Sequence, residues 1–149
     1  MTDADIAARQ RWMAVLARAD LSSLQSAWDG LDAPGSFQVL RAPERGLVLT
    51  RGRAGGSGRP FNLGEVSVTR CSVRAETGHI GHAYCLGSVP EKAELAARLD
   101  ALLQDPGRQN ALLSQVIEPL AADQSAKKDL AARKAAATKV DFFTMVRGS

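Results

Sequence analysis

The chain has 149 residues, of which 45% are hydrophobic and 23% charged, and its formal net charge is +3. This length predicts one compact domain with its own core, and so small a positive excess does not indicate a nucleic-acid partner. Two cysteines exclude a disulfide framework as the basis of the fold. The amino terminus resembles no secretory signal, and no apolar run approaches about eighteen residues, so we expect a soluble cytoplasmic protein.

Two helices are predicted at the amino terminus, over residues 3–19 and 20–30. Apolar residues recur in both at spacings of three and four, and Asp3, Asp20 and Gly30 are suitable end residues. The first helix carries Trp12 and the second carries Trp28. Their helical spacing favours a role in the core over a role in ligand binding.

A four-stranded antiparallel sheet is predicted next. The segment 46–87 holds most of the glycines and both histidines, and its short apolar runs alternate with turn signals. The first two strands are expected at 36–42 and 47–53, separated by a turn that starts at Pro43. The third and fourth strands are built on the apolar runs 66–73 and 80–86.

The third and fourth strands are expected to form a hairpin with a two-residue turn at Thr77 and Gly78. The predicted pairs are Cys71 with Tyr84, Val73 with His82, and Ala75 with Ile80. This register places the apolar side chains on one face and points the two thiols to opposite faces, where they stay reduced. The other side of the last strand has small residues, which leave room for a helix; they are Gly81, Ala83, Cys85 and Gly87.

Three helices are predicted after the sheet, over residues 88–104, 105–119 and 120–139, with Pro119 ending or kinking the second. The last is rich in alanine, but beyond its first residue Leu130 is its only large apolar side chain. An apolar tail follows, with candidate partner-docking residues Phe142, Phe143, Met145 and Val146. Residues 120–149 are expected either to project as an arm that docks into another subunit or to fold back onto the sheet.

A glycine-rich loop offers the candidate ligand site. Its arginines and backbone amides suit polyphosphate or another anion. The candidate anion-binding residues are Arg51, Arg53, Gly55, Gly56, Gly58 and Arg59. The loop lacks the Gly-Lys-Ser/Thr ending of a phosphate-binding P-loop, so a plain hairpin or assembly loop is the alternative.

The sequence predicts no catalytic residues and no metal site. His79 and His82 are three apart in a strand and point to opposite faces, and His82 fits a hydrogen-bonded core histidine better than a base or ligand. Cys71 and Cys85 lack the spacing of zinc or thioredoxin-like motifs. The lysines and arginines of 127–139 predict a solvated helix face.

Several blocks of the chain resemble, in order, the PhnG subunit family of bacterial carbon–phosphorus lyase. They are residues 9–17, 46–48, the glycines of 55–58, 61–71, Gly81 with Tyr84, 93–104 and 140–148. The resemblance covers nearly the whole chain. An Arg-Asp pair is common in that family after the glycine at 87, whereas this chain has Ser88 and Val89, so no role for that arginine carries over.

The resemblance implies a subunit of a core complex with PhnI-, PhnH- and PhnJ-like subunits, assisted by a PhnL-like subunit of the ATP-binding-cassette type. In that complex an alkylphosphonate displaces adenine from ATP and gives ribose 1-phosphonate 5-triphosphate. A PhnJ-like radical S-adenosylmethionine subunit then cleaves the carbon–phosphorus bond. The nucleosidase chemistry is attributed to the PhnI-like subunit, which is the most direct partner implied.

We therefore predict a single α+β domain with two helices before an antiparallel four-stranded sheet and three after it. Its expected function is that of an assembly subunit without catalytic residues, metal or cofactor of its own, while ATP and phosphonate are substrates of the complex. One alternative is that Arg51, Arg53 and Arg59 contribute directly to a shared active site. Another is a free-standing RNA-binding module, although neither a nucleic-acid nor a membrane partner is expected.

Overall fold

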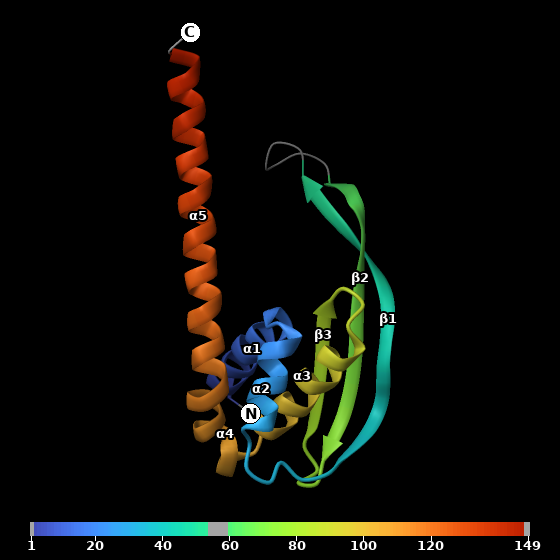
Figure 1. Ribbon diagram of the computed structural model, residues 1–149. Coiled ribbons are helices and arrows are strands. Elements are labelled where there is room, and N and C mark those ends of the chain that lie inside the picture. The colour runs from blue at the N-terminus through green and yellow to red at the C-terminus, as the bar shows by residue number, and fades with distance from the viewer. Residues whose placement is uncertain (1, 54–59, 148–149) are drawn as a thin grey trace.

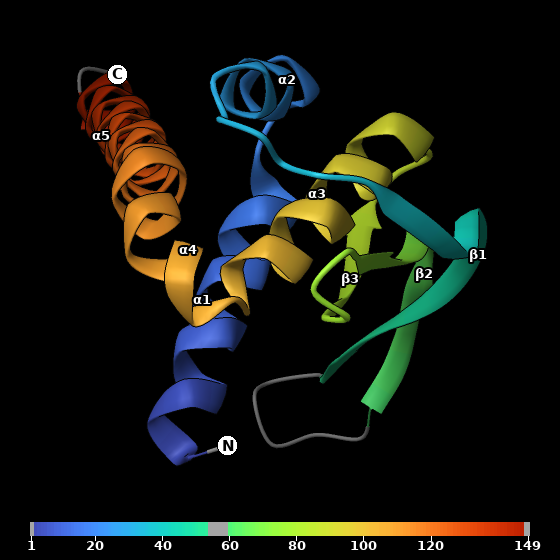
Figure 2. The ribbon, with the colours of Figure 1, turned by 90° about the horizontal axis from the view of Figure 1, so that it is seen from below.

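The computed structural model describes the backbone of residues 2–53 and 60–147 and the side chains of residues 2–49 and 64–138. The elements before and within the sheet are α1 (Asp3–Arg18), α2 (Leu21–Asp29), β1 (Phe37–Arg53), β2 (Pro60–Ala75) and β3 (Ile80–Leu86). Those after it are α3 (Pro90–Leu103), α4 (Pro106–Leu112), the π-helical turn η1 (Leu113–Ile117) and α5 (Glu118–Arg147). The helices lie on one side of the sheet in both views of Figures 1 and 2. The predicted α+β class is confirmed.

The two amino-terminal helices form close to where the apolar spacing predicts them. Thr2 caps α1: its hydroxyl accepts from the amide of Asp5 at 3.2 Å, and the Asp5 carboxylate accepts from the Thr2 amide at 3.1 Å. This reciprocal pair satisfies two amides that the helix itself leaves unbonded. Trp12 is 3% exposed and lies in the core, and Trp28 packs against it. The predicted core role of both tryptophans is confirmed.

One long edge strand replaces the two strands predicted at 36–42 and 47–53. Strand β1 passes through Pro43 without a turn and stays paired with β2, although its register shifts on both sides of Arg41. Pro43 has no N–H to donate to a neighbouring strand. It is tolerated because β1 has a neighbour on one side only and because the regular pairing with β2 is interrupted between Arg41 and Glu44. The sheet therefore has three antiparallel strands in the order β1-β2-β3, and the prediction of four is wrong.

The turn between β2 and β3 has three residues, so the predicted register is wrong. The Ala75 amide donates to the His79 carbonyl at 2.9 Å and closes a loop of residues 76–78. Within it Gly78 has φ +92°, a left-handed conformation that glycine adopts without steric cost. The observed pairs are Cys71 with Ala83, Val73 with Gly81, and Arg74 with Ile80. Every even-numbered side chain of β3 therefore changes to the opposite face.

The small-residue side of β3 is the side that α3 covers, as its composition predicts. A Cβ atom on Gly81 would lie 1.9 Å from the Ala97 carbonyl oxygen and 2.6 Å from the Ala101 amide nitrogen. Only glycine allows the helix to lie this close to the strand. Cys71 and Cys85 are both buried on this covered face and form no disulfide. The expectation that the thiols point to opposite faces is wrong, because it depended on the two-residue turn.

Residues 106–147 form one continuous helical run, so of the two predicted effects of Pro119, ending the helix is wrong. In η1 the Glu118 amide donates to the carbonyl of Leu113, five residues back. The widened turn lies directly before Pro119, whose ring would otherwise clash with the preceding turn and which has no N–H to donate. Two helical units therefore follow the sheet instead of three.

Helix α5 extends beyond the rest of the molecule, as Figure 1 shows. Every side chain from position 125 to 138 is exposed, and Leu130 is 47% exposed. Before that stretch, the Gln124 side chain donates to the Val15 carbonyl at 2.9 Å and ties the start of α5 to α1. None of the helices described here is long and apolar enough to span a membrane.

Candidate functional site

The predicted anion site lies at the end of the β1–β2 hairpin. Arg51 and Arg53 are the last residues of β1 and pair in register with Asn62 and Pro60. Their side chains, and the whole of residues 54–59 with Gly55, Gly56, Gly58 and Arg59, lie outside the described residues. Anion binding by this loop stays a prediction.

The predicted docking tail is the carboxyl end of α5 rather than a separate segment. The backbone is helical through Phe142, Phe143, Met145 and Val146 to Arg147. Neither proline nor glycine occurs between Pro119 and Gly148, so no residue interrupts the helix. The side chains of 139–147 lie outside the described set, and their contacts stay a prediction.

A buried carboxylate that the sequence analysis missed joins α1, β3 and α3. Asp100 is fully buried and accepts from Arg9 Nε at 3.2 Å and Nη2 at 2.9 Å, from Trp12 Nε1 at 2.8 Å, and from the His82 amide at 2.9 Å. The hydrogen bond to Asp100 is the main cause that raises the pKa of Arg9 above its ordinary value. The Asp100 carboxylate accepts all of these hydrogen bonds from groups of the fold, so Asp100 has a structural role. A single aspartate within the apolar stripe of α3 was the signal in the sequence.

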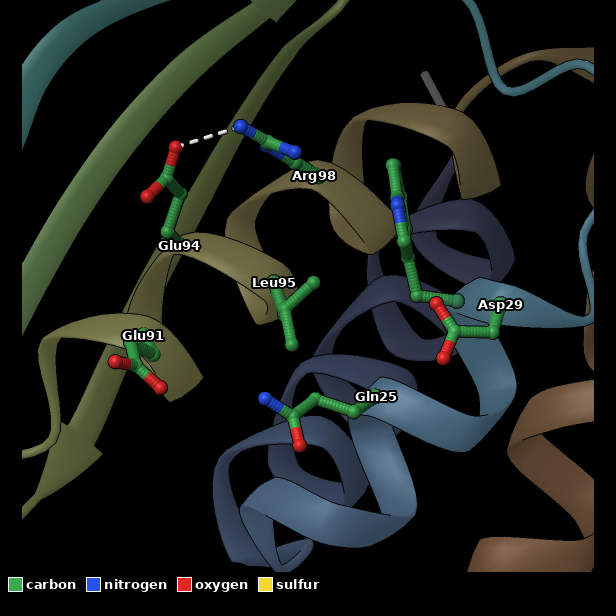
Figure 3. Close-up of a pocket in the computed structure, with 7 residues that line it drawn as sticks. Gln25, Asp29, Glu91, Glu94, Leu95 and Arg98 are labelled. Carbon is green, nitrogen blue, oxygen red and sulfur yellow. Dashed lines mark hydrogen bonds and ion pairs between the residues drawn. The ribbon is translucent and has the colours of Figure 1, made fainter.

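A charged hollow lies between α2 and α3 (Figure 3). It has a volume of about 500 Å³ and is lined by Gln25, Trp28, Asp29, Glu91, Glu94, Leu95 and Arg98. Arg98 is already engaged: its Nη2 lies 2.7 Å from Glu94 Oε1, and its guanidinium lies 5.5 Å from the Trp28 ring centroid. The remaining carboxylates disfavour an anion there, and no group of three metal-binding side chains occurs among the residues described.

The uncovered face of the sheet gathers basic and polar side chains. We call this the outer basic face; its members are Arg41, Arg70, Ser72, Arg74, His82 and Tyr84. One row across the three strands contains Arg41, Ser72 and His82, and the next contains Arg70 and Tyr84. All of them except Ser72 are exposed. A hollow of about 360 Å³ is lined by the members of this face other than Arg74, together with Cys71, Ala83 and Met13 of α1.

His82 belongs to this face and not to the core, which corrects the sequence-based expectation. Its Nδ1 lies 2.8 Å from the Ser72 hydroxyl, and its side chain is exposed. The Arg70 guanidinium carbon lies 5.8 Å from the centroid of the Tyr84 ring, within the range of a cation–π contact. The shift of one residue in the β2–β3 register explains why the sequence missed this site.

Comparison with known proteins gives a consistent result over nearly the full length. Residues 7–148 match the family described as phosphonate metabolism protein PhnG. The chain belongs to the PhnG family. It is also 47% identical over 146 residues to a protein of Rhizobium meliloti (strain 1021) named alpha-D-ribose 1-methylphosphonate 5-triphosphate synthase subunit PhnG. The match covers 98% of this chain and 93% of that protein.

Membership of the PhnG family confirms the resemblance found in the sequence and connects the chain with phosphonate metabolism.

Proposed function

We propose that this PhnG-family chain is an assembly subunit of a ribose 1-methylphosphonate 5-triphosphate synthase complex. In such a complex an alkylphosphonate replaces adenine at the ribose C1 of ATP. A PhnI-like subunit is the most direct partner, with PhnH-, PhnJ- and PhnL-like subunits in the same assembly. The reacting groups and any cofactor belong to the partners, and this chain holds them in place.

The observation that carries the proposal is the exposure of α5. Fourteen consecutive positions, 125–138, present every side chain to solvent, and at 1.5 Å per residue they span roughly 20 Å. A helix gains most of its stability in proteins from packing one face against other elements, and this stretch has no such face within the described chain. A partner subunit is the natural neighbour for it.

A second projecting element supports the same function. Beyond the part of the sheet that α3 covers, the β1–β2 hairpin extends as a two-stranded ribbon (Figure 1). Leu47 and Leu49 on this ribbon are 65% and 51% exposed. Exposed leucines on a two-stranded ribbon gain free energy when a partner removes them from water.

Truncation after Val140 tests the assembly function. The shortened chain, co-expressed with a PhnI-like subunit, is expected to lose co-purification because it lacks the end of α5. Circular dichroism and the urea midpoint show whether the body stays folded. The substitution Ile6→Ser, at a residue 41% exposed on α1, is the matched control and is expected to leave co-purification intact. Unimpaired assembly of the folded, truncated chain would overturn the proposal.

A second candidate function is a direct contribution to a shared active site. It is favoured by the position of Arg51 and Arg53 at the far end of the projecting hairpin. Neutralising the loop with Arg53→Gln and Arg59→Gln would then abolish adenine release by the assembled complex while leaving co-purification unchanged. Adenine release at the wild-type rate excludes this role, and the assembly function does not depend on it.

A further inference from the structure

The outer basic face carries a concentration of positive charge that the fold does not use. Arg41, Arg70 and Arg74 lie on adjacent rows of the sheet, and the acidic residue paired into these rows is Glu44, opposite Arg70. None of the three arginines forms an ion pair with a carboxylate in the described part of the chain. In Figures 1 and 2 no described helix covers this side of the sheet.

Arg70 is exposed, and an aromatic contact orients its guanidinium. Its guanidinium lies over the Tyr84 ring, and a Cβ atom placed on Gly46 would come within 3.2 Å of Arg70 Nη2. Val68, between Gly46 and Leu86 in the sheet, is only 1% exposed. Because Gly46 has no side chain, the Arg70 guanidinium can occupy the space beside it. A cation oriented in this way loses little conformational entropy when a ligand binds.

The pair formed by Ser72 and His82 supplies a hydrogen-bond donor in either tautomer. If His82 Nδ1 accepts from the Ser72 hydroxyl, then Nε2 carries a proton and can donate. If Nδ1 donates to the hydroxyl oxygen, the hydroxyl proton is free to donate instead. In both cases one N–H or O–H group lies beside Arg41 in the same row.

We propose that the outer basic face binds a phosphate- or phosphonate-bearing anion, with Arg41 and Arg70 as the paired cations and the Ser72–His82 pair as an additional donor. The hollow of about 360 Å³ suits a small polyanion. Guanidinium groups bind such oxyanions through pairs of N–H donors. The site shares no residue with the glycine-rich loop and includes none from α5, so its test is independent of the assembly function.

Calorimetric titration of the full chain tests the proposal with three probes: inorganic tripolyphosphate, ATP and methylphosphonate, at constant ionic strength. The wild-type chain is expected to bind at least one of them saturably. The double variant Arg41→Gln with Arg70→Gln is expected to weaken binding by at least about tenfold. A matched pair on α5, Arg133→Gln with Lys134→Gln, removes the same charge from exposed positions and is expected to change affinity less than about twofold.

The variant Gly46→Ala separates a positioned site from general charge attraction. It keeps the net charge but makes the Arg70 guanidinium give way by a few tenths of an ångström, so affinity is expected to fall by less than in the double variant while the melting temperature shows that the sheet is retained. Preference among the probes identifies the source of the anion: tripolyphosphate and ATP together indicate a triphosphate, and methylphosphonate indicates a phosphonate.

Three results would overturn the proposal. One is equal loss of affinity in the two double variants, which indicates diffuse attraction. Another is the absence of saturable binding for all three probes. The third is loss of co-purification with a partner in the Arg41/Arg70 variant while no probe binds to the wild-type chain. In that event the face is a protein-docking surface.

Discussion

The covered face of the sheet and the projecting α5 helix are opposite in composition and in exposure. On the covered face Leu99 and Leu103 of α3 are fully buried against β2 and β3. On α5, by contrast, every side chain from position 125 to 138 is exposed, and most are alanine or charged. Burial of apolar area is the main favourable term in folding, so the body carries the stability and residues 125–138 add little of their own.

The difference shows how one chain separates folding from recognition. The body also pairs the buried carboxylate of α3, because Asp100 accepts from donors on two other elements, α1 and β3. The projecting helix and hairpin leave apolar side chains exposed to solvent, and examples are Leu47, Leu49 and Leu130. Substitutions in the body should therefore change stability, and substitutions in the projections should change association.

Removal of the Asp100 carboxylate is expected to have the largest effect on the body. Asp100→Ala leaves the Trp12 indole N–H and the His82 amide without their acceptor and leaves the Arg9 charge, whose side chain is 25% exposed, without its partner. Breaking a buried pair from one side costs about 3–5 kcal/mol. Urea unfolding of the two proteins measures the difference.

An exposed aspartate is the control for this prediction. Asp123 lies 3.1 Å from Lys127 with its side chain 55% exposed, and Asp123→Ala should cost less than about 1 kcal/mol. If Asp100→Ala were as mild as this control, the network would not be the tie between helices and sheet that the geometry indicates.

A methyl group at position 81 is the next strongest test. Gly81→Ala would place a carbon atom against backbone atoms of α3, which have no rotamer by which to move away, so helix and strand must separate. Overpacking of this kind costs roughly 2–3 kcal/mol. Gly30→Ala, where the new carbon lies 3.6 Å from its neighbour at an ordinary helical φ of −82°, should change stability by less than about 1 kcal/mol. Thermal unfolding compares the two, and equal shifts would contradict the close contact.

The same glycine shows how much of the fold the sequence could predict. The small side of β3 correctly predicts a helix at close range, because the residue types alone set the space available. The register depends on a single residue in the turn, and Thr77 with Gly78 fits a two-residue or a three-residue loop. Likewise, a proline such as Pro43 would interrupt a central strand, whereas an edge strand can pass through it. The sequence does not reveal that β1 is an edge strand.

Prediction of the candidate site failed for a related reason. The outer basic face is assembled from three strands, and its rows exist only once the register is known. Arg41, Arg70 and His82 are 29 and 12 residues apart in sequence, so no local motif connects them. The family resemblance succeeded because it depends on ordered blocks along the chain and not on pairing across the sheet.

The buried thiols give the body a pH dependence. Burial is the main cause that raises the pKa of both Cys71 and Cys85 above the ordinary value of 9.0. The unfolded chain therefore loses these protons first as the pH rises. The stability that the protonated thiols contribute is complete below about pH 9 and is lost above it. Urea unfolding at pH 7 and pH 10 should show the decline, and the variant Cys71→Ala with Cys85→Ala should show a smaller one.

The smallest effect on stability is expected where leucines lie on the projecting hairpin. Leu47→Ala with Leu49→Ala removes side chains that are already more than half exposed, so the free energy of unfolding should change by about 0.5 kcal/mol or less. Leu99→Ala, the same substitution at a fully buried position, should cost about 2–5 kcal/mol because it leaves a cavity. Urea unfolding compares the two. If the hairpin variant lost more than about 1 kcal/mol, its leucines would already be packed in the isolated chain, and a partner would gain little by covering them.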